Sequence, residues 1–328
     1  MVDNARLSGP MTSGTLCDHL VRYDAAAWQQ AVDTLSAATH EIDRNATKIW
    51  FAFFPLDLHL ALQSAGDEDA TVRKLGLMGN WRLREQVDSS HRFLFAHRYW
   101  PQVKAAIQAA EPPFADDLAA LITAVADAAT RTARCDREFL VGITGVGMMT
   151  LRQAGPEAFA DAPGAIHLSD RARALSAYQL MARRARDDWQ GLFGFLRGVR
   201  KRWTVTFDEN DPGATFSLIH GQEIASAAQS DKREYRSRDS RCIPGEGPIP
   251  VECRAASCGT CWVGVLGGAQ KLSPVVDRDE RRRMQVFGYI DTDEPKPLIR
   301  LACQAKASGA VSIVIPPWNG MFGKQLRS

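Results

Sequence analysis

Residues 253–261 read Cys253-Arg-Ala-Ala-Ser-Cys258-Gly-Thr-Cys261, and after 41 intervening residues a fourth cysteine follows as Cys303, within Leu-Ala-Cys-Gln. Three thiols so close in sequence can surround one side of a metal centre only if the loop between them is tight. Gly259 and its small neighbours permit such a loop, and they let backbone N–H groups point at the sulfurs. The remote Cys303 would close the cage and tie a later strand to the loop.

The spacing decides between two metal centres. C-x4-C-x2-C with a distant fourth cysteine is typical of plant-type [2Fe–2S] clusters, whereas structural zinc sites usually combine paired C-x2-C knuckles, of which this chain has one. We therefore predict that Cys253, Cys258, Cys261 and Cys303 bind a [2Fe–2S] cluster. Cys242 lies close enough to reach the cluster edge as a spare ligand or redox-active thiol, but a bystander thiol is the simpler interpretation.

The residues around the cysteines extend the motif. Trp203–Pro317 resembles the [2Fe–2S] ferredoxin domain of the plant, adrenodoxin and oxygenase-reductase families, with Gly221-Gln-Glu-Ile-Ala-Ser-Ala-Ala, Ile249-Pro-Val-Glu-Cys253 and Arg300-Leu-Ala-Cys303-Gln as its segments. The resemblance implies a β-grasp fold and a one-electron carrier of low potential, with its cluster near the surface. This sequence departs from the family in a long stretch around 281–297 and in Arg254, a cation that we expect to favour the reduced cluster and raise its potential.

The chain changes character near residue 200. Residues 16–200 have a helical composition punctuated by Gly and Pro, and no alternating strand pattern. We predict helices over 24–40, 68–78, 82–98, 101–110, 115–135 and 169–198. After Trp203, hydroxylated and apolar β-formers alternate, which predicts a hairpin, then a strand at 262–266, a helix at 279–287 and a closing strand at 310–315. The expected fold class is α+β, with an all-helical domain at residues 1–200 and a β-grasp ferredoxin-like domain at 201–328.

Composition narrows the functional classes. The chain has 328 residues, 40 Lys and Arg against 38 Asp and Glu, and a formal charge of +2, which gives no argument for nucleic-acid binding. The start shows no secretory signal, and the apolar runs Ile49–Leu62 and Phe139–Leu151 are shorter than a membrane span and indicate buried core. Seven cysteines without a pairing pattern fit a reducing compartment. We expect a cytoplasmic protein without a membrane span, and its oligomeric state stays open.

Three further patterns have a functional and a simpler interpretation. Basic residues gather in the predicted 279–287 helix and in the segment before the cysteines. They predict either a basic face that binds an acidic partner or a solvated charged surface. These residues are Arg278, Arg281, Arg282, Arg283, Lys232, Arg233, Arg236, Arg238 and Arg241. Glu85, Asp88 and His91 resemble half of a di-iron site without a matching half, so a structural role is favoured. Gly142, Gly145 and Gly147 favour close helix packing over a phosphate loop.

These observations predict an electron-transfer protein. The cluster would pass single electrons between a reductase and an acceptor enzyme, with the helical domain as docking platform or oligomerisation module. The pattern favours an electron carrier over a stand-alone enzyme, because no flavin or nicotinamide motif is visible. Two alternatives stay open: a subunit of an oxidoreductase with a second cofactor in the helical domain, and a redox sensor whose cluster state alters partner binding.

Overall fold

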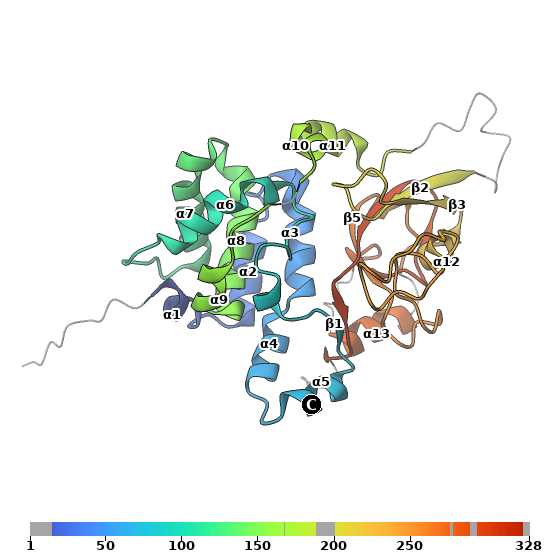
Figure 1. The fold of residues 1–328 in the computed structure, drawn as a ribbon, viewed down its shortest axis with the longest axis horizontal. Helices are drawn as coiled ribbons and strands as arrows, with labels where there is room; N and C mark the ends of the chain where they lie inside the picture. Colours follow the sequence, from blue (N-terminus) through green and yellow to red (C-terminus); the bar gives the residue numbers. More distant parts are fainter. Residues whose placement is uncertain (1–14, 167, 188–200, 276–277, 289–293, 324–328) are drawn as a thin grey trace, which may run out of the picture.

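The two halves of the chain lie side by side in the computed structural model, with helices on one side and the sheet on the other (Figure 1). The structure describes residues 15–166, 168–187, 201–275, 278–288 and 294–323. The expected α+β class is confirmed, with a helical N-terminal region and a C-terminal sheet region. Within the described ranges, no helix is long and apolar enough to cross a membrane.

The helical region packs around one central helix, α8, in which every residue from Leu140 to Leu151 is buried. Gly142 and Gly147 allow this packing, because a Cβ at these positions would lie 2.4 Å from Thr47 and 2.6 Å from Ile107. The helices are α1 (Leu16–Leu20), α2 (Ala25–Leu35), α3 (Glu41–Phe53), α4 (Leu56–Gln63), α5 (Glu68–Leu75), α6 (Trp100–Gln108), α7 (Leu118–Ala133), α8 (Arg137–Ala154), α9 (Pro156–Asp161), α10 (Asp170–Ala174) and α11 (Ala177–Arg183). The apolar stripe predicted for 115–135 is the buried face of α7.

Two of the predicted helices are wrong in part. Residues 82–98 form turns and the short 3-10 helices η1 (Leu83–Glu85) and η2 (Phe95–Tyr99), because the buried Asp43 carboxylate accepts the backbone N–H groups of Phe95 and Ala96 at 2.7 and 2.8 Å. The helix predicted at 169–198 breaks into α10 and α11, and its end lies outside the described residues. Met78–Gly79 form a two-residue strand, β1, that the sequence pattern did not predict.

The C-terminal region is built on a mixed five-stranded sheet in the order β3-β2-β8-β5-β6. β2 and β8 run parallel, and the other neighbours in this sheet are antiparallel, as expected for a β-grasp fold whose first and last strands meet at the centre. Its elements are β2 (Arg202–Thr206), β3 (Thr215–Ile219), β4 (Gln222–Glu223), α12 (Ile224–Ala228), β5 (Trp262–Gly267), the 3-10 helix η4 (Ala269–Lys271), α13 (Arg278–Phe287), β6 (Ile299–Leu301), β7 (Lys306–Ala307), β8 (Val311–Val314) and β9 (Trp318–Asn319).

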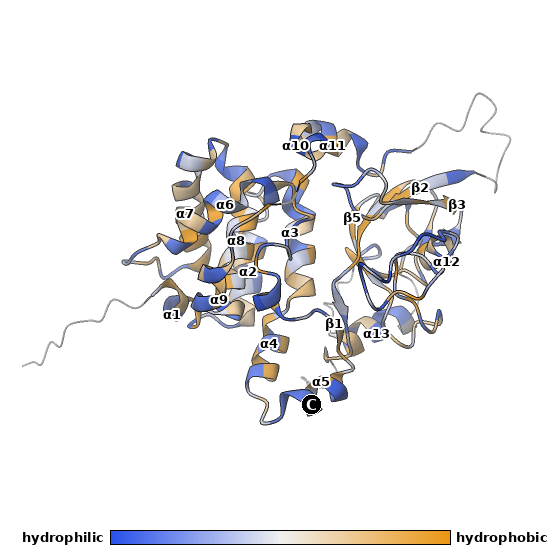
Figure 2. Cartoon of the chain, in the orientation of Figure 1, coloured by the Kyte–Doolittle hydropathy of each residue, from blue (hydrophilic) through white to orange (hydrophobic). Residues whose placement is uncertain are grey.

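One continuous apolar core runs through both regions. Helix α3 lies against β5 (Figure 1), where a Cβ on Gly264 would be 2.5 Å from Ile49. β5, which reads Trp-Val-Gly-Val-Leu-Gly, is largely apolar (Figure 2). The C-terminal β9 pairs with β1, and the indole of Trp318 donates to the Phe53 carbonyl at 2.7 Å. The division into two domains at residue 200 stays a prediction. The structure shows that the two regions share one apolar core.

Buried charge also joins the two regions. The Arg184 guanidinium, at the end of α11, forms two 2.8 Å hydrogen bonds with the Glu209 carboxylate in the turn after β2. Both side chains are at least nine-tenths buried, and Ser312 of β8 donates to the same carboxylate at 2.6 Å. Separating a buried ion pair would leave an uncompensated charge away from water, which costs free energy, so this pair fixes α11 against the sheet.

Candidate iron–sulfur site

The loop between Cys253 and Cys261 folds its backbone around a sulfur atom. Cys253 Sγ accepts the N–H groups of Ala255, Ser257 and Cys258 at 3.4, 3.3 and 3.3 Å. Arg254 and Ala256 both have φ of 53°, a left-handed conformation that turns these groups inward. Burial raises the pKa of the Cys253 thiol, but the hydrogen bonds from the loop outweigh it and lower the pKa to about 6. The loop thus stabilises a thiolate, the form that binds metal.

The four thiols form two hydrogen-bonded pairs, and the pairs also interact with each other, Cys261 with Cys258 and Cys303 with Cys253. Cys253 interacts with Cys258, and Cys303 accepts a hydrogen bond from Cys261. That hydrogen bond lowers the pKa of Cys303 to about 7 and, with burial, raises that of the donor Cys261. Among the described residues, no three Cys, His, Asp or Glu side chains are placed to hold a single metal ion. Two thiol pairs match the two irons of a [2Fe–2S] cluster, each of which takes two cysteines.

Two polar side chains support the sulfurs. The Thr260 hydroxyl accepts the Glu252 N–H at 3.2 Å and lies 3.1 Å from Cys258 Sγ, where it can donate. Gln304 Nε2 lies 3.4 Å from Cys303 Sγ. Such donors stabilise anionic sulfur and help to set the potential of a cluster. The sequence motif contained both residues but gave no signal of their role.

Helix α13 supports the loop from beneath. Gly259 has φ of +70°, and a Cβ there would lie 2.4 Å from the Phe287 ring, so this position tolerates no side chain. Phe287 in turn packs edge-on against Trp262, with ring centroids 5.4 Å apart. The Glu280 carboxylate binds the fully buried Arg300 guanidinium at 3.1 and 3.3 Å, three residues before Cys303. The helix predicted at 279–287 thus contacts both the cysteine loop, through Phe287, and the segment before Cys303, through Glu280.

The site has a buried and an accessible side. Cys261 and Cys303 are buried, with 2% and 7% of their surface exposed, whereas Cys253 and Cys258 are partly exposed. The surface side is therefore the loop between Cys253 and Cys258.

Arg254, the cation expected beside the cluster, has a carboxylate partner. Its guanidinium lies 3.0 Å from the Glu246 carboxylate, which offsets the positive charge beside the loop. Cys242 is buried, its thiol donates to the Pro248 carbonyl at 3.3 Å, and burial raises its pKa to about 11. A neutral, buried thiol fits a bystander.

Many of the predicted basic residues have partners within the chain. Arg233 binds Asp231 and Arg241 binds Asp239, each at 2.6 Å, and Arg238 lies 3.8 Å from Asp211. Lys232 donates to the Gly245 carbonyl, and Arg281 to the carbonyls of Val275 and Glu294. Arg236 and Arg282 are exposed. The side chain of Arg278 lies outside the described residues. The basic face stays a prediction, with its charge partly neutralised.

The acidic and histidine residues of the helical region have structural roles. Asp88 accepts hydrogen bonds from the Trp100 indole at 2.7 Å and from the Gly164 and Ala165 backbone, which occupies both carboxylate oxygens. His91 is fully buried against Trp100 and hydrogen-bonds to His97. This arrangement agrees with the structural interpretation of the motif.

Residues 245–308 match the family of 2Fe-2S iron-sulfur cluster binding domains. The match contains all four predicted ligands and confirms a ferredoxin-type [2Fe–2S] domain in the C-terminal region. Searches of curated proteins and of solved structures found no significant match.

Proposed function

We propose that Cys253, Cys258, Cys261 and Cys303 hold the [2Fe–2S] cluster of this ferredoxin-type domain, and that the chain passes single electrons between a reductase and an acceptor enzyme in the cytoplasm. The observation that carries the proposal is the arrangement of the four thiols in two pairs, one partly exposed and one buried. The cluster supplies reversible one-electron chemistry when bound. The chain contributes the thiolates, the N–H groups aimed at Cys253 and the exclusion of water from Cys261 and Cys303.

The accessible side of the site favours transfer to another protein. Cys253 and Cys258 lie on the surface loop, so a partner can approach the sulfurs that they provide. We further propose that the helical region forms part of the docking platform. Its support is the shared core, which holds α3 against β5 and so fixes the helices relative to the cluster loop.

The experiment compares two cysteine variants of the full chain. The purified protein should contain about two irons and two sulfides per chain, and the dithionite-reduced form should give the paramagnetic resonance spectrum of a [2Fe–2S] cluster. Cys258→Ser should lose that spectrum, whereas Cys242→Ser, the matched control, should keep it. A single zinc in the wild type, or an intact cluster in Cys258→Ser, would contradict the ligand assignment.

A further inference from the structure

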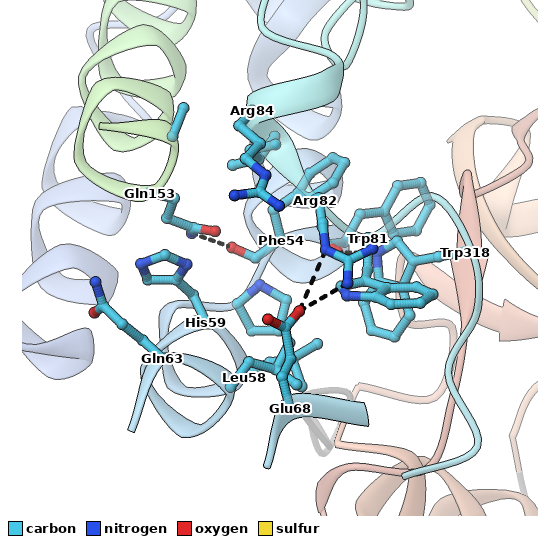
Figure 3. Close-up of a pocket in the computed structure, with 15 residues that line it drawn as sticks. Phe54, Leu58, His59, Gln63, Glu68, Trp81, Arg82, Arg84, Gln153 and Trp318 are labelled. Atoms are coloured by element: carbon cyan, nitrogen blue, oxygen red, sulfur yellow. Dashed lines mark hydrogen bonds and ion pairs between the residues drawn. The ribbon is translucent and has the colours of Figure 1, made fainter. Parts of the chain in front are cut away.

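A cavity of about 290 Å³ lies where the helical region meets the C-terminal segment (Figure 3). Its walls come from the end of α3, from α4, from the segment 81–84, from the end of α8 and from β9. The volume is near the lower end of the range for small-molecule sites, which suits one or two rings. No residue of the iron–sulfur site lines it.

Aromatic rings dominate the apolar wall. Phe53, Phe54, Trp81 and Trp318 line the cavity, and Figure 3 shows Phe54, Trp81 and Trp318 around it. The indole nitrogen of Trp81 is buried, and no hydrogen-bond acceptor reaches it in the described part of the chain.

The polar groups leave an excess of positive charge. Arg82 is neutralised by Glu68, with which it forms hydrogen bonds of 2.8 and 3.3 Å. Arg84 also lines the cavity, and within the described ranges it has no carboxylate partner. Burial and the charge of Arg152 lower the pKa of His59, which is therefore neutral near pH 7 and adds a donor and an acceptor without charge. The cavity thus combines an aromatic wall with one uncompensated guanidinium.

We infer that this cavity binds a small, planar aromatic acid, whose ring packs against the tryptophans and whose anionic oxygens pair with Arg84. A guanidinium recognises a carboxylate with two parallel N–H donors, so the acid group would fix the orientation of the ring. Gln153 adds an amide oxygen, because its nitrogen already donates to the Phe54 carbonyl at 3.0 Å.

The occupant would lie at one end of a series of contacts that reaches the cluster loop. Trp318 contacts Phe322, with ring centroids 5.7 Å apart, and a Cβ on Gly288 would lie 2.3 Å from the Phe322 ring. The preceding residue, Phe287, packs against Gly259. This series gives the site a structural link to the cysteine loop, although binding itself needs no cluster chemistry.

The test measures binding to the full-length, cluster-containing protein by titration calorimetry. The probes are 2-naphthoate and its uncharged counterpart 2-naphthylmethanol. We expect naphthoate to bind once per chain and at least tenfold more tightly than the alcohol. Arg84→Gln should abolish this preference, whereas Arg131→Gln on the exposed face of α7 should retain it.

A second variant tests the location. Ala154→Phe places a ring in the cavity wall and should remove binding of both probes. Absence of saturable naphthoate binding to the wild type, an unchanged acid-to-alcohol ratio in Arg84→Gln, or unchanged affinity in Ala154→Phe would each overturn the inference. These readouts do not depend on the cysteine assignment, so a failure here leaves the electron-transfer proposal separately testable.

Discussion

The buried ion pair between Glu280 and Arg300 should hold in place the segment that leads to Cys303, the proposed fourth ligand. Arg300 is 0% exposed and Glu280 4%, and the guanidinium also donates to the Ser273 carbonyl at 2.8 Å. The carboxylate additionally accepts the Leu301 N–H at 3.4 Å. Truncation of Glu280 would therefore leave a buried cation whose one remaining acceptor among the described residues is the Ser273 carbonyl. Breaking a buried pair in this way costs about 3–5 kcal/mol, a large part of the stability of an ordinary domain.

Three variants separate the charge effect from general damage. Glu280→Ala should lower the free energy of unfolding in urea by about 3–5 kcal/mol and accelerate loss of the cluster chromophore, because Cys303 follows Arg300 on the same segment. Glu280→Met/Arg300→Met removes both charges at similar volume and should recover most of that loss. The control is Asp127→Ala, which removes the partner of Arg137 in a pair about half exposed and should cost under about 1 kcal/mol.

The result that would refute this reasoning is specific. If Glu280→Ala were no more destabilising than Asp127→Ala, the carboxylate would not be compensating a buried charge. If the double Met variant were as unstable as the single one, the loss would come from packing and not from the unpaired cation.

Three other perturbations have expected outcomes. Gly259→Ala forces a Cβ against the Phe287 ring of α13 and should lower the free energy of unfolding in urea by about 2–5 kcal/mol, with loss of the cluster. The control Gly221→Ala, with φ of +78° but open space around the Cβ, should cost only about 1–2 kcal/mol. Equal losses in the two variants would reject the steric argument. Burial raises the pKa of Asp43 to about 6, so the folded state favours the protonated carboxyl. The free energy of unfolding should therefore fall by up to about 3 kcal/mol as the pH rises from about 4 to 6. The difference in unfolding free energy between wild type and Asp43→Asn, measured across that pH range, should show this fall, and a constant difference would contradict it. Arg254→Ala should lower the midpoint potential of the cluster and Glu246→Gln should raise it. Each shift should be on the order of 20 mV, the value for a unit charge about 10 Å away in water. In the same redox titration, the double variant should have a midpoint potential near that of the wild type.

The sequence predicted the chemistry of the site better than its support. Cysteine spacing is a local property, so a tight loop and a distant fourth thiol could be predicted from residues 253–303 alone. The pairing of the thiols and the contact of Gly259 with Phe287 depend on how α13 packs, which no local pattern encodes. Arg254 shows the same limit, because its partner Glu246 lies on a neighbouring loop whose geometry the sequence does not reveal.

The helical region shows where periodicity succeeds and fails. The stripe of α7 repeats at three and four residues and predicted a helix correctly, because one face of that helix meets the core. Residues 82–98 have helical composition, yet a side chain from α3, Asp43, captures their backbone N–H groups. Similarly, β1 forms only because β9, some 240 residues later, supplies its partner. Long-range contacts of this kind override local propensity.

The strand that leaves the cysteine loop explains why the two regions share one core. β5 reads Trp-Val-Gly-Val-Leu-Gly, and its first five residues are all buried, as in strands covered on both faces. One cover is α3, whose Ile49 and Phe53 lie so close to Gly264 that any side chain there would clash. Without the helices, this apolar face beside Cys261 would be open to water. The helical region is therefore part of the structure that positions the third cysteine, whatever partner or ligand it also receives.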